Sequence, residues 1–397
     1  SFPTRRSSDL IQASAWLYGI DGAAPDRARI LDIGCGDASH LMPFALAYPQ
    51  AEIIGIDLSS EKIEAGQLQF KLAGIKNTQL FCTDLENLLA GLGVQFDYII
   101  IHNIFSLLDS QTREALFAFC QQHLTSQGVV ATEWLTQPGA GVSQIIQDAI
   151  ALHARDANSD ELRLSSARAA LTWLSLGMSQ HPAREALQEL ISEAEAMDDE
   201  TFALRYLHGM NNASYFVDFH ESVTRSGLRY VGDLFPWKEC PAHYGDKVAE
   251  LSEAVCPHKD KLLVQQYLDF SVNRRSRFSL LTVAESAQDI AAQPDLSRLR
   301  DFHWAASFRR EIDGNGKIYN RLRSESGAFI ATDDVVTLSV LDALGEAWPL
   351  SMSFEQLAFH TRSPETEKVD HEEKLLLSLG ALFMQGAAGL YFRSEEH

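Results

Sequence analysis

From residue 29 onward, short apolar runs alternate with longer runs whose apolar residues recur at helical spacing. Continuous apolar runs are typical of strands buried on both faces, and helices between them are typical of a parallel sheet. The predicted strand and helix pairs are 29–33 and 41–47, 52–57 and 61–73, 79–84 and 85–92, and 97–101 and 112–124, followed by a strand at 129–134. This order predicts a doubly wound α/β domain.

The strand pattern stops between residues 141 and 212, where charged or alanine-rich helical periodicity replaces it, as in 183–196. Strands are predicted again at 228–234 and 278–284, each preceded by a helix, at 219–226 and 261–273. We expect them to be the sixth and seventh strands of the same sheet. The helical block would then be an insertion into one domain.

The last part of the chain combines strand and helix patterns in a different order. It contains a strand-like run at 302–310, a turn at 314–316, helices at 333–347, 354–361 and 372–383, and a strand-like end at 389–392. This order predicts a small winged-helix-like domain. Its 10 basic and 15 acidic residues between 294 and 392 argue against a DNA-binding wing.

The composition is that of a soluble globular protein of two or three domains, with 397 residues, 46% of them hydrophobic. The net charge of −21 disfavours nucleic acid as a partner, and no apolar run approaches the length of a membrane span. The five cysteines are scattered, with no C-x-x-C pair to indicate zinc, so we expect reduced thiols, no metal and a cytoplasmic protein.

Both ends of the chain have an unusual composition. Residues 2–10 resemble the translation of a common sequencing adapter, and the final residues resemble the translated start of its partner. We therefore expect residues 1–10 and 393–397 to be foreign to the protein.

Two glycines follow the first predicted strand, in the run Asp32-x-Gly34-Cys35-Gly36. A loop here lets its backbone approach a ligand closely, because glycine has no Cβ atom. Taken alone, the pair is equally consistent with a structural turn. We expect these four residues to belong to a ligand site.

Carboxylates end the next two predicted strands. Asp57, followed by Leu58, lies where open α/β sheets bind ligands and can accept hydrogen bonds from both hydroxyls of a ribose. Asp84 can accept from the exocyclic amine of an adenine while Leu85 offers apolar contact. Asp84 can also cap the following helix, and the two roles are compatible. Three successive strand ends therefore present the groups that bind an adenosine.

Two classes of adenosine-bearing cofactor compete for these residues. A nicotinamide dinucleotide requires G-x-G-x-x-G to hold its pyrophosphate at a helix N-terminus, whereas Gly36 is followed by Asp37, which would repel it. S-adenosylmethionine has no phosphate and carries a positive sulfonium and a positive ammonium. The residues therefore favour S-adenosylmethionine and a methyltransferase.

The chain resembles class I S-adenosylmethionine-dependent methyltransferases in the series Asp32-x-Gly34-x-Gly36, Asp57, Asp84 and Phe96-Asp97-Tyr98-Ile99-Ile100. It resembles bacterial methyltransferases with a methyltransferase regulatory domain in Tyr215-Phe216, Gln266-Tyr267-Leu268-Asp269-Phe270, Asn273-Arg274-Arg275 and Arg277-Phe278. The best-understood branch of that group methylates lysines of outer-membrane proteins. The resemblance implies a seven-stranded Rossmann-like sheet, S-adenosylmethionine as cofactor and a protein lysine as acceptor.

The chain departs from this family in three places. Ala38 stands where the family usually has glycine. After the fourth strand the family favours His-Gly-(Val)-Tyr-Ser-Trp, whereas residues 102–107 read His-Asn-Ile-Phe-Ser-Leu. After the fifth strand only a Thr-x-Pro-Gly frame survives, at 136–139. Cofactor binding is therefore better supported than lysine as the acceptor.

Candidates for catalysis follow the fourth and fifth strands, because methyl transfer mainly requires an unprotonated nucleophile held in line with the methyl carbon. His102, also a candidate cofactor contact, could accept a proton or be a packed histidine, and Asn103 is its neighbour. Glu133 could orient an amine or form a salt bridge. Trp134 could wall the methyl channel, although a tryptophan here is more often part of the core.

In the regulatory region, we expect Tyr215 and Phe216 to serve packing and interfaces. Arg274, Arg275 and Arg277 either receive an acidic partner surface or form a solvated helix end, the interpretation that we favour.

These patterns predict a cofactor-binding methyltransferase core at 11–140, a helical insertion at 141–212, a regulatory region completing the sheet at 213–293 and a winged-helix-like domain at 294–392. We expect methylation of protein lysines. The alternatives are a small-molecule methyltransferase, or a non-catalytic cofactor-binding regulator or scaffold. A homodimer, formed through the helical insertion in the scaffold hypothesis, is left open.

Overall fold

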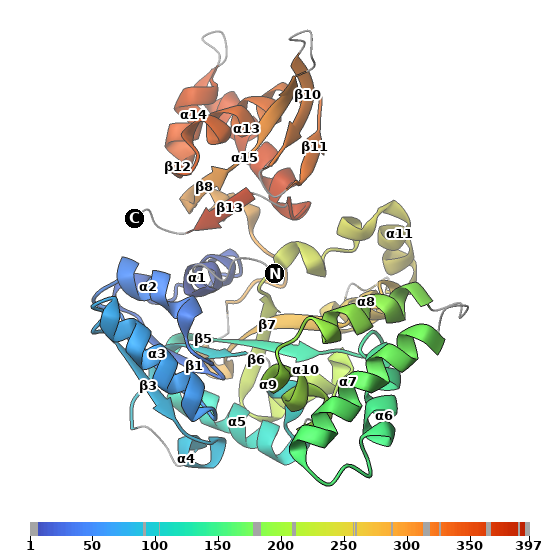
Figure 1. Ribbon diagram of the computed structural model, residues 1–397. Coiled ribbons are helices and arrows are strands. Elements are labelled where there is room, and N and C mark those ends of the chain that lie inside the picture. Colours follow the sequence, from blue (N-terminus) through green and yellow to red (C-terminus); the bar gives the residue numbers. More distant parts are fainter. Residues whose placement is uncertain are drawn as a thin grey trace.

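The chain folds into a large α/β body and a smaller C-terminal domain, which Figure 1 shows below and above. The computed structural model describes residues 7–89, 93–102, 104–177, 184–208, 212–256, 258, 260–286, 289–312, 318–324, 327–362, 367–387 and 390–393.

A seven-stranded sheet forms the centre of the body, in the order β3-β2-β1-β4-β5-β7-β6. Its strands are β1 (Arg29–Ile33), β2 (Glu52–Asp57), β3 (Thr78–Cys82), β4 (Phe96–Ile101), β5 (Leu124–Leu135), β6 (Leu228–Asp233) and β7 (Ser276–Val283). The first five strands pair in parallel, whereas β7 is antiparallel to both β5 and β6. The predicted seven-stranded Rossmann-like sheet is confirmed, including the two strands after the insertion.

Helices cover both faces of this sheet (Figure 1). One face carries α1 (Ser7–Leu17), α2 (Met42–Ala47) and α3 (Ser60–Leu72), and the other carries α4 (Leu85–Leu89), α5 (Ser110–His123) and α10 (Phe216–Arg225). Neighbouring strand residues such as Ile30 and Leu31 join different hydrophobic clusters, one on each face. Both faces are buried, which explains why the strands read as continuous apolar runs.

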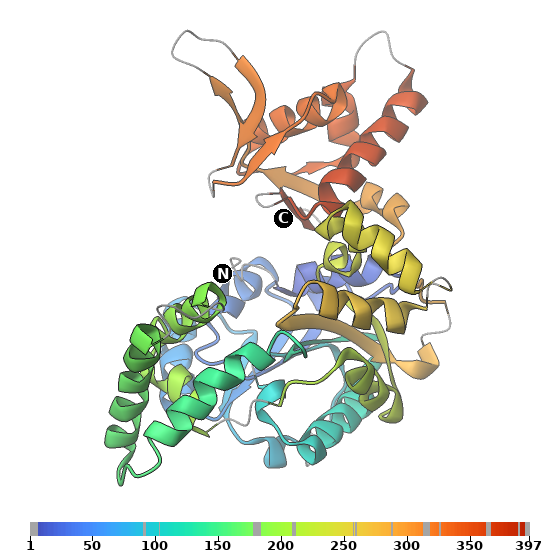
Figure 2. The ribbon, with the colours of Figure 1, turned by 90° about the vertical axis from the view of Figure 1, so that its right-hand side faces the viewer.

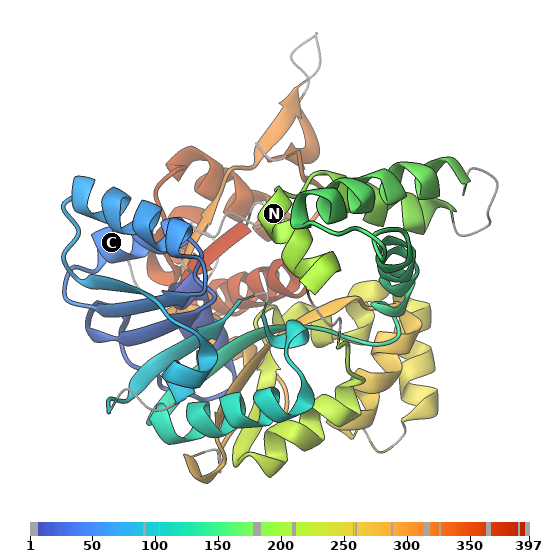
Figure 3. The same ribbon diagram turned by 60° about the horizontal axis from the view of Figure 1, so that its bottom comes forward.

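The insertion is helical, as expected, and extends to one side of the body (Figure 3). It consists of α6 (Gly141–His153), α7 (Asp160–Gly177), α8 (Arg184–Glu195), α9 (Asp199–Ala203) and a π-helical turn (Leu204–His208). Its buried residues, among them Ile146, Leu171 and Phe202, form a hydrophobic cluster separate from those of the sheet. The insertion therefore has a small core of its own.

The chain returns from the insertion beside the end of β5. Arg113 of α5 donates to the carbonyl oxygen of Phe105 (2.9 Å) and to Oγ of Ser214 (3.1 Å), so it joins the loop after β4 to the returning segment. At the end of β5, a Cβ on Gly139 would lie 2.2 Å from the carbonyl oxygen of Arg274. Only glycine allows these two loops to approach so closely.

Two further helices, α11 (Asp246–Val255) and α12 (Lys261–Ser271), precede β7. The C-terminal domain then contains β8 (His303–Ala306), β9 (Arg309–Ile312), β10 (Ile318–Arg323), β11 (Phe329–Ala331), α13 (Val335–Ala347), β12 (Met352–Ser353), α14 (Phe354–Thr361), α15 (Lys368–Met384) and β13 (Leu390–Arg393). One small sheet has the order β12-β8-β13 and the other β11-β10-β9. Figure 2 shows β9 and β10 projecting away from the body. The order helix, strand, helix, helix, strand from α13 to β13 agrees with the predicted winged-helix-like domain.

One predicted element of this domain is wrong. The single strand expected at 302–310 is divided into β8 and β9, which belong to different sheets. Between them, the carbonyl oxygen of Phe308 would lie 2.1 Å from a Cβ on Gly345 of α13, so the chain turns against the helix backbone at this point. The turn expected at 314–316 lies outside the described residues.

None of the described helices combines enough length with enough hydrophobicity to span a membrane.

We expect Gly66→Ala to destabilise the fold, because α3 packs on the glycine loop at this residue. A Cβ on Gly66 would lie 2.3 Å from the backbone oxygen of Asp37 and 2.9 Å from Cδ1 of Leu80. The overpacking should lower the free energy of unfolding by about 1–3 kcal/mol, which is more than alanine gains in helix propensity over glycine. Urea unfolding measures the change. Gly177→Ala is the control, since no described atom outside its own stretch of helix lies within 4 Å of its Cβ position, and an equal effect in both variants would contradict this explanation.

Candidate active site at the carboxyl ends of the strands

The glycine loop after β1 adopts a backbone conformation that favours glycine. Gly34 has φ +83° and Gly36 has φ +59°. A Cβ on Gly34 would lie 2.8 Å from the carbonyl oxygen of His102, whereas a Cβ on Gly36 would lie 3.9 Å from Cδ of Lys62. Gly34 is therefore required by the close approach of the loop after β4, and Gly36 leaves space beside the backbone.

Ala38 occupies the third position of this loop with φ +56° and is fully buried. This left-handed conformation costs about 1 kcal/mol for a residue with a Cβ atom. The strain explains why glycine is the usual residue here in the family that the sequence resembles.

Backbone hydrogen bonds join the loop to β2. The N–H groups of Gly34 and Cys35 both donate to the carbonyl oxygen of Ile56, at 2.9 and 3.0 Å. The Cys35 side chain is buried against Gly55, and burial raises the pKa of its thiol well above the usual range. Cys35 can therefore contribute its backbone to a ligand, but not a thiolate.

Asp57 ends β2 and points toward the glycine loop. Its Oδ2 accepts from the N–H of Gly36 (2.8 Å) and its Oδ1 accepts from the N–H of Ser59 (2.9 Å). Each carboxylate oxygen has two lone pairs, so both retain capacity for a further donor. Leu58, which follows, is 70% exposed.

Asp84 caps the helix after β3, as one of the two sequence interpretations predicted. Its Oδ1 accepts from the N–H of Asn87 at 2.8 Å, and the residue is exposed. Leu85 is half-buried and packs against the hydrophobic cluster beneath α4 and α5. The cap does not prevent Asp84 from accepting from a ligand as well.

Three ionisable side chains converge at the end of β1. Asp32 is fully buried, and Nε2 of His40 lies 2.7 Å from its Oδ2. Nε2 of His102, from the residue after β4, lies 3.8 Å from the same oxygen, and the two imidazole rings are arranged edge to face with centroids 5.2 Å apart. Sequence analysis missed His40, because nothing in the pattern shows that its short helix turns it back toward β1.

The charge of this group depends on His40. Burial alone would lower the pKa of His40, but the hydrogen bond and charge of Asp32, together with the charge of Asp37, outweigh burial and raise it. A raised pKa means that the protonated ring stabilises the fold at acid pH. That contribution is lost as the pH rises through the pKa of His40.

Glu133 and Trp134 lie on opposite faces of β5. Glu133 pairs with Phe278 of β7. The ring centroid of Phe278 lies 6.0 Å from that of His102, so the strand pairing brings Glu133 to the part of the sheet where His102 lies. Trp134 is 2% exposed and stacks on Phe219 of α10 at 4.1 Å. The side chain of Trp134 is therefore part of the core on that face, the alternative that the sequence favoured, and its role as a wall of the methyl channel stays a prediction. Asn103 lies outside the described residues.

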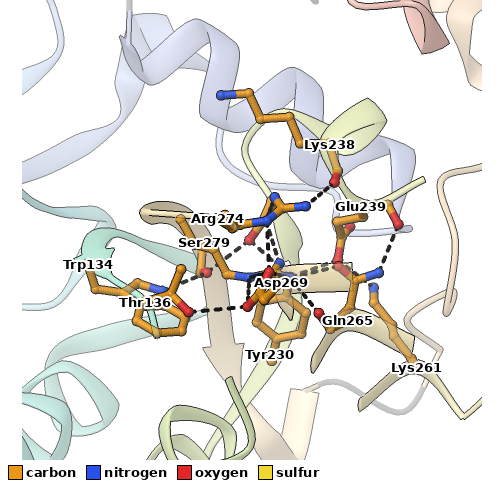
Figure 4. Close-up of polar contacts among 12 residues, drawn as sticks. Trp134, Thr136, Tyr230, Lys238, Glu239, Lys261, Gln265, Asp269, Arg274 and Ser279 are labelled. Carbon is orange, nitrogen blue, oxygen red and sulfur yellow. Dashed lines mark hydrogen bonds and ion pairs between the residues drawn. The ribbon is translucent and has the colours of Figure 1, made fainter. Parts of the chain in front are cut away.

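A buried ionic network lies beside the end of β5 (Figure 4). Arg277 of β7 donates to Asp269 of α12 and to Asp233 of β6, both at 2.7 Å. Thr136, just after β5, donates to Asp269 at 3.2 Å. The network therefore attaches the end of β5 to the elements that follow the insertion.

The arginines of this region are not a solvated helix end, and that expectation is wrong for two of them. Arg277 is 2% exposed, and Arg274 is 7% exposed and forms an ion pair with Asp269 at 2.8 Å. Arg275 is more exposed and pairs with Glu193 of α8, at 2.7 Å. The two buried arginines are paired with buried carboxylates on other elements and are not solvated. The sequence around the arginines does not indicate these partners.

Two atoms of the site are buried without a hydrogen-bond partner among the described residues, Oδ1 of Asp32 and Nε2 of His102. An unsatisfied buried polar group costs about 1–3 kcal/mol, so a ligand that supplies a donor to the carboxylate would be stabilised here. Together with the glycine loop and Asp57, these residues suit a ligand that has vicinal hydroxyls at one end and a cation at the other.

Comparison with known proteins adds two family matches. A model described as "Methyltransferase domain" matches residues 30–128, which contain most of β1, the glycine loop and β2 to β4. A model described as "Predicted methyltransferase regulatory domain" matches residues 198–283, which contain Asp233, Asp269, Arg274 and Arg277 of the buried network.

Relatives have been found in Rickettsia prowazekii. Protein RP789 is 28% identical over 269 residues, which are 67% of this chain and 48% of RP789. Protein RP028 is 28% identical over 217 residues, 54% of this chain and 86% of RP028. The chain thus spans about half the length of RP789.

A solved structure, PKMT2 from Rickettsia typhi in complex with AdoHcy, has a similar fold. The TM-score is 0.81 at 23% sequence identity, over 99% of this chain and 76% of PKMT2. The likeness shows that the fold is shared across the body and the C-terminal domain.

We expect Trp134→Phe to destabilise the fold without disturbing the site. The change removes the hydrogen bond from Nε1 to Oγ of Ser279 (3.0 Å) and reduces buried volume, at a cost of about 1–2 kcal/mol. NMR titration should give an unchanged pKa for His40, and a shift in that pKa would show that Trp134 contributes to the site. Trp173→Phe, at a residue 64% exposed on α7, is the control and should leave both stability and titration unchanged.

Proposed function

Because the chain joins a methyltransferase domain to a methyltransferase regulatory domain, we propose that it binds S-adenosylmethionine and transfers the methyl group to lysine side chains of proteins. The observation that carries the proposal is the meeting of three groups at adjacent strand ends: the glycine loop, Asp57 and the incompletely bonded Asp32. The similar structure of PKMT2 was solved with AdoHcy, which supports a cofactor of this class.

Each strand end has a role in holding the donor. Asp57 accepts from the ribose hydroxyls while it also holds the N–H of Gly36, so the loop and the ribose contact are positioned together. Asp84 accepts from the adenine amine and Leu85 packs on the ring. Asp32 accepts from the ammonium group. When bound, the donor supplies a methyl group on a sulfonium, which needs no metal and no strong base for transfer.

The acceptor side of the site is formed by the ends of β4 and β5. A lysine amine must lose its proton before it reacts, and burial beside the Phe278 ring favours the neutral amine. Glu133 orients the amine, and His102 accepts the proton that is released. The role of Asn103 as the neighbour of His102 stays a prediction.

Charge supports a protein acceptor rather than a nucleic acid. The net charge of −21 attracts lysine-bearing segments and repels phosphate backbones. The family that the sequence resembles has a branch that methylates lysines of outer-membrane proteins. One observation favours a small-molecule acceptor instead: the residues after β4 and β5 differ from the pattern of that family.

We expect Asp57→Ala to weaken the binding of S-adenosylhomocysteine about tenfold, because the carboxylate holds both ribose hydroxyls. Calorimetric titration measures the affinity, and thermal unfolding of the same sample shows that the variant is folded. Asp148→Ala, at an exposed aspartate of α6 that also accepts a side-chain hydrogen bond, is the matched control. Unchanged affinity in Asp57→Ala would remove this residue from the site.

We expect the protein to transfer labelled methyl groups from S-adenosylmethionine to proteins of a cell-envelope extract. Acid hydrolysis of the labelled protein fraction should yield methylated lysine, and Asp57→Ala should transfer less at limiting donor. Label found only in metabolites would favour the small-molecule alternative. Label in nucleic acid would contradict the argument from charge.

A further inference from the structure

His40 lies at the site but is not among the residues that the sequence pattern indicated. It belongs to a short 3-10 helix (Ser39–Leu41) directly after the glycine loop, and its side chain is only 17% exposed. Its Nε2 lies 2.7 Å from Oδ2 of Asp32, while Oδ1 of the same carboxylate has no hydrogen-bond partner among the described residues. His40 thus occupies Oδ2 of the Asp32 carboxylate, and Oδ1 is left for the proposed ligand.

We propose that His40 is a positioning residue for the methyl donor, and that binding of the donor's ammonium group at Asp32 expels a proton from the His40 ring. The inference rests on the proposed function, since it requires an ammonium-bearing donor in this site. It goes further in assigning His40 a role and in making donor affinity depend on pH.

The proton balance is simple. Before binding, a protonated His40 carries one positive charge against the negative charge of Asp32, so the pair is neutral. The donor's ammonium adds a second positive charge beside the same buried carboxylate. Two positive charges that share one buried carboxylate repel each other, and the repulsion disfavours the protonated form of His40. His40 then releases the Nδ1 proton to solvent and keeps the Nε2 proton, which continues to donate to Oδ2 of Asp32. No bond other than N–H changes.

The charged groups around His40 allow this step. Asp37, in the loop before it, holds the N–H of Ser39 through Oδ1 at 3.0 Å, and adds to the negative potential at His40. His102 approaches from the end of β4 and is the second ring that could carry the proton. Asp57 accepts from the N–H of Gly36 in the same loop, and Cδ of Lys62 lies 3.9 Å from the position of a Cβ on Gly36. Among these groups, His40 is the one directly hydrogen-bonded to Asp32.

The direction of the pH dependence follows from these charges. The pKa of His40 is raised, so at about pH 6.5, the ordinary pKa of histidine, more than half of the protein carries the extra proton. The donor must displace that proton, and its affinity should fall as the pH is lowered through the pKa of His40. Well below that pKa, the decrease should approach about tenfold per pH unit.

Calorimetry in two buffers of different ionisation enthalpy tests the proposal directly. We expect the full chain to release a proton, between half and one per S-adenosylhomocysteine bound, at about pH 6.5. Both buffers contain EDTA, so that no metal ion contributes to the proton count. Binding of 5′-methylthioadenosine, which lacks the ammonium group, should release no proton.

Three variants separate positioning from a merely structural role. His40→Gln keeps a side-chain N–H donor for Asp32 but cannot be protonated. It should therefore bind S-adenosylhomocysteine with no proton release, and its affinity should not depend on pH at about pH 6.5. His102→Gln should retain the release. His123→Gln is the matched control, because His123 of α5 bonds to the carbonyl oxygen of Phe119 and is not part of the site.

Release of a proton by wild type and by His102→Gln, and its loss in His40→Gln, supports the proposal. The proposal is overturned if wild type releases no proton, if His40→Gln releases as many as wild type, or if His102→Gln abolishes the release. Failure of the proposed function looks different: neither S-adenosylhomocysteine nor 5′-methylthioadenosine would then bind. If both ligands bind without proton release, only the role of His40 is lost.

Discussion

Arg277 holds two carboxylates from two other elements inside the protein, and the position of the acceptor side of the site depends on that contact. Burial by itself would lower the pKa of Arg277, but Asp233 and Asp269 outweigh it and keep the guanidinium charged. Removing one partner of such a buried group leaves an uncompensated charge, at a cost of about 3–5 kcal/mol. The network thereby keeps β7 between β5 and β6, and places Phe278 beside His102.

This arrangement changes the meaning of a regulatory region. The segment is not a separate module beside the methyltransferase core, because its strand β7 pairs with β5 along six residues and its Asp269 accepts from Thr136 at the end of β5. Glu133, a candidate catalytic residue, pairs with Phe278 of this segment. The segment matched by the regulatory family model and the candidate site are therefore joined by backbone pairing within one sheet.

The two halves of the site differ in how completely their polar groups are bonded. On the adenosine side, Asp57 already holds the N–H groups of Gly36 and Ser59, so a ribose would meet a carboxylate that is oriented in advance. On the methionine side, Asp32 and His102 keep buried atoms without hydrogen-bond partners among the described residues. A cationic ligand would supply a donor to the oxygen of Asp32 that His40 leaves without a hydrogen bond.

Much of this molecule was determined by the sequence alone. Apolar runs identified all seven strands of the sheet, and the residues at the strand ends indicated the glycine loop, Asp57 and Asp84, because strand periodicity and glycine are local properties. The tertiary structure alone decided the direction of β7, the burial of Arg274 and Arg277, the face on which Trp134 lies and the approach of His40 to Asp32. Each of these depends on partners that are far apart in the chain or on the turn of a short helix. A charged or aromatic residue has the same local pattern in solvent and in the core, and only the partner that packs against it decides between them.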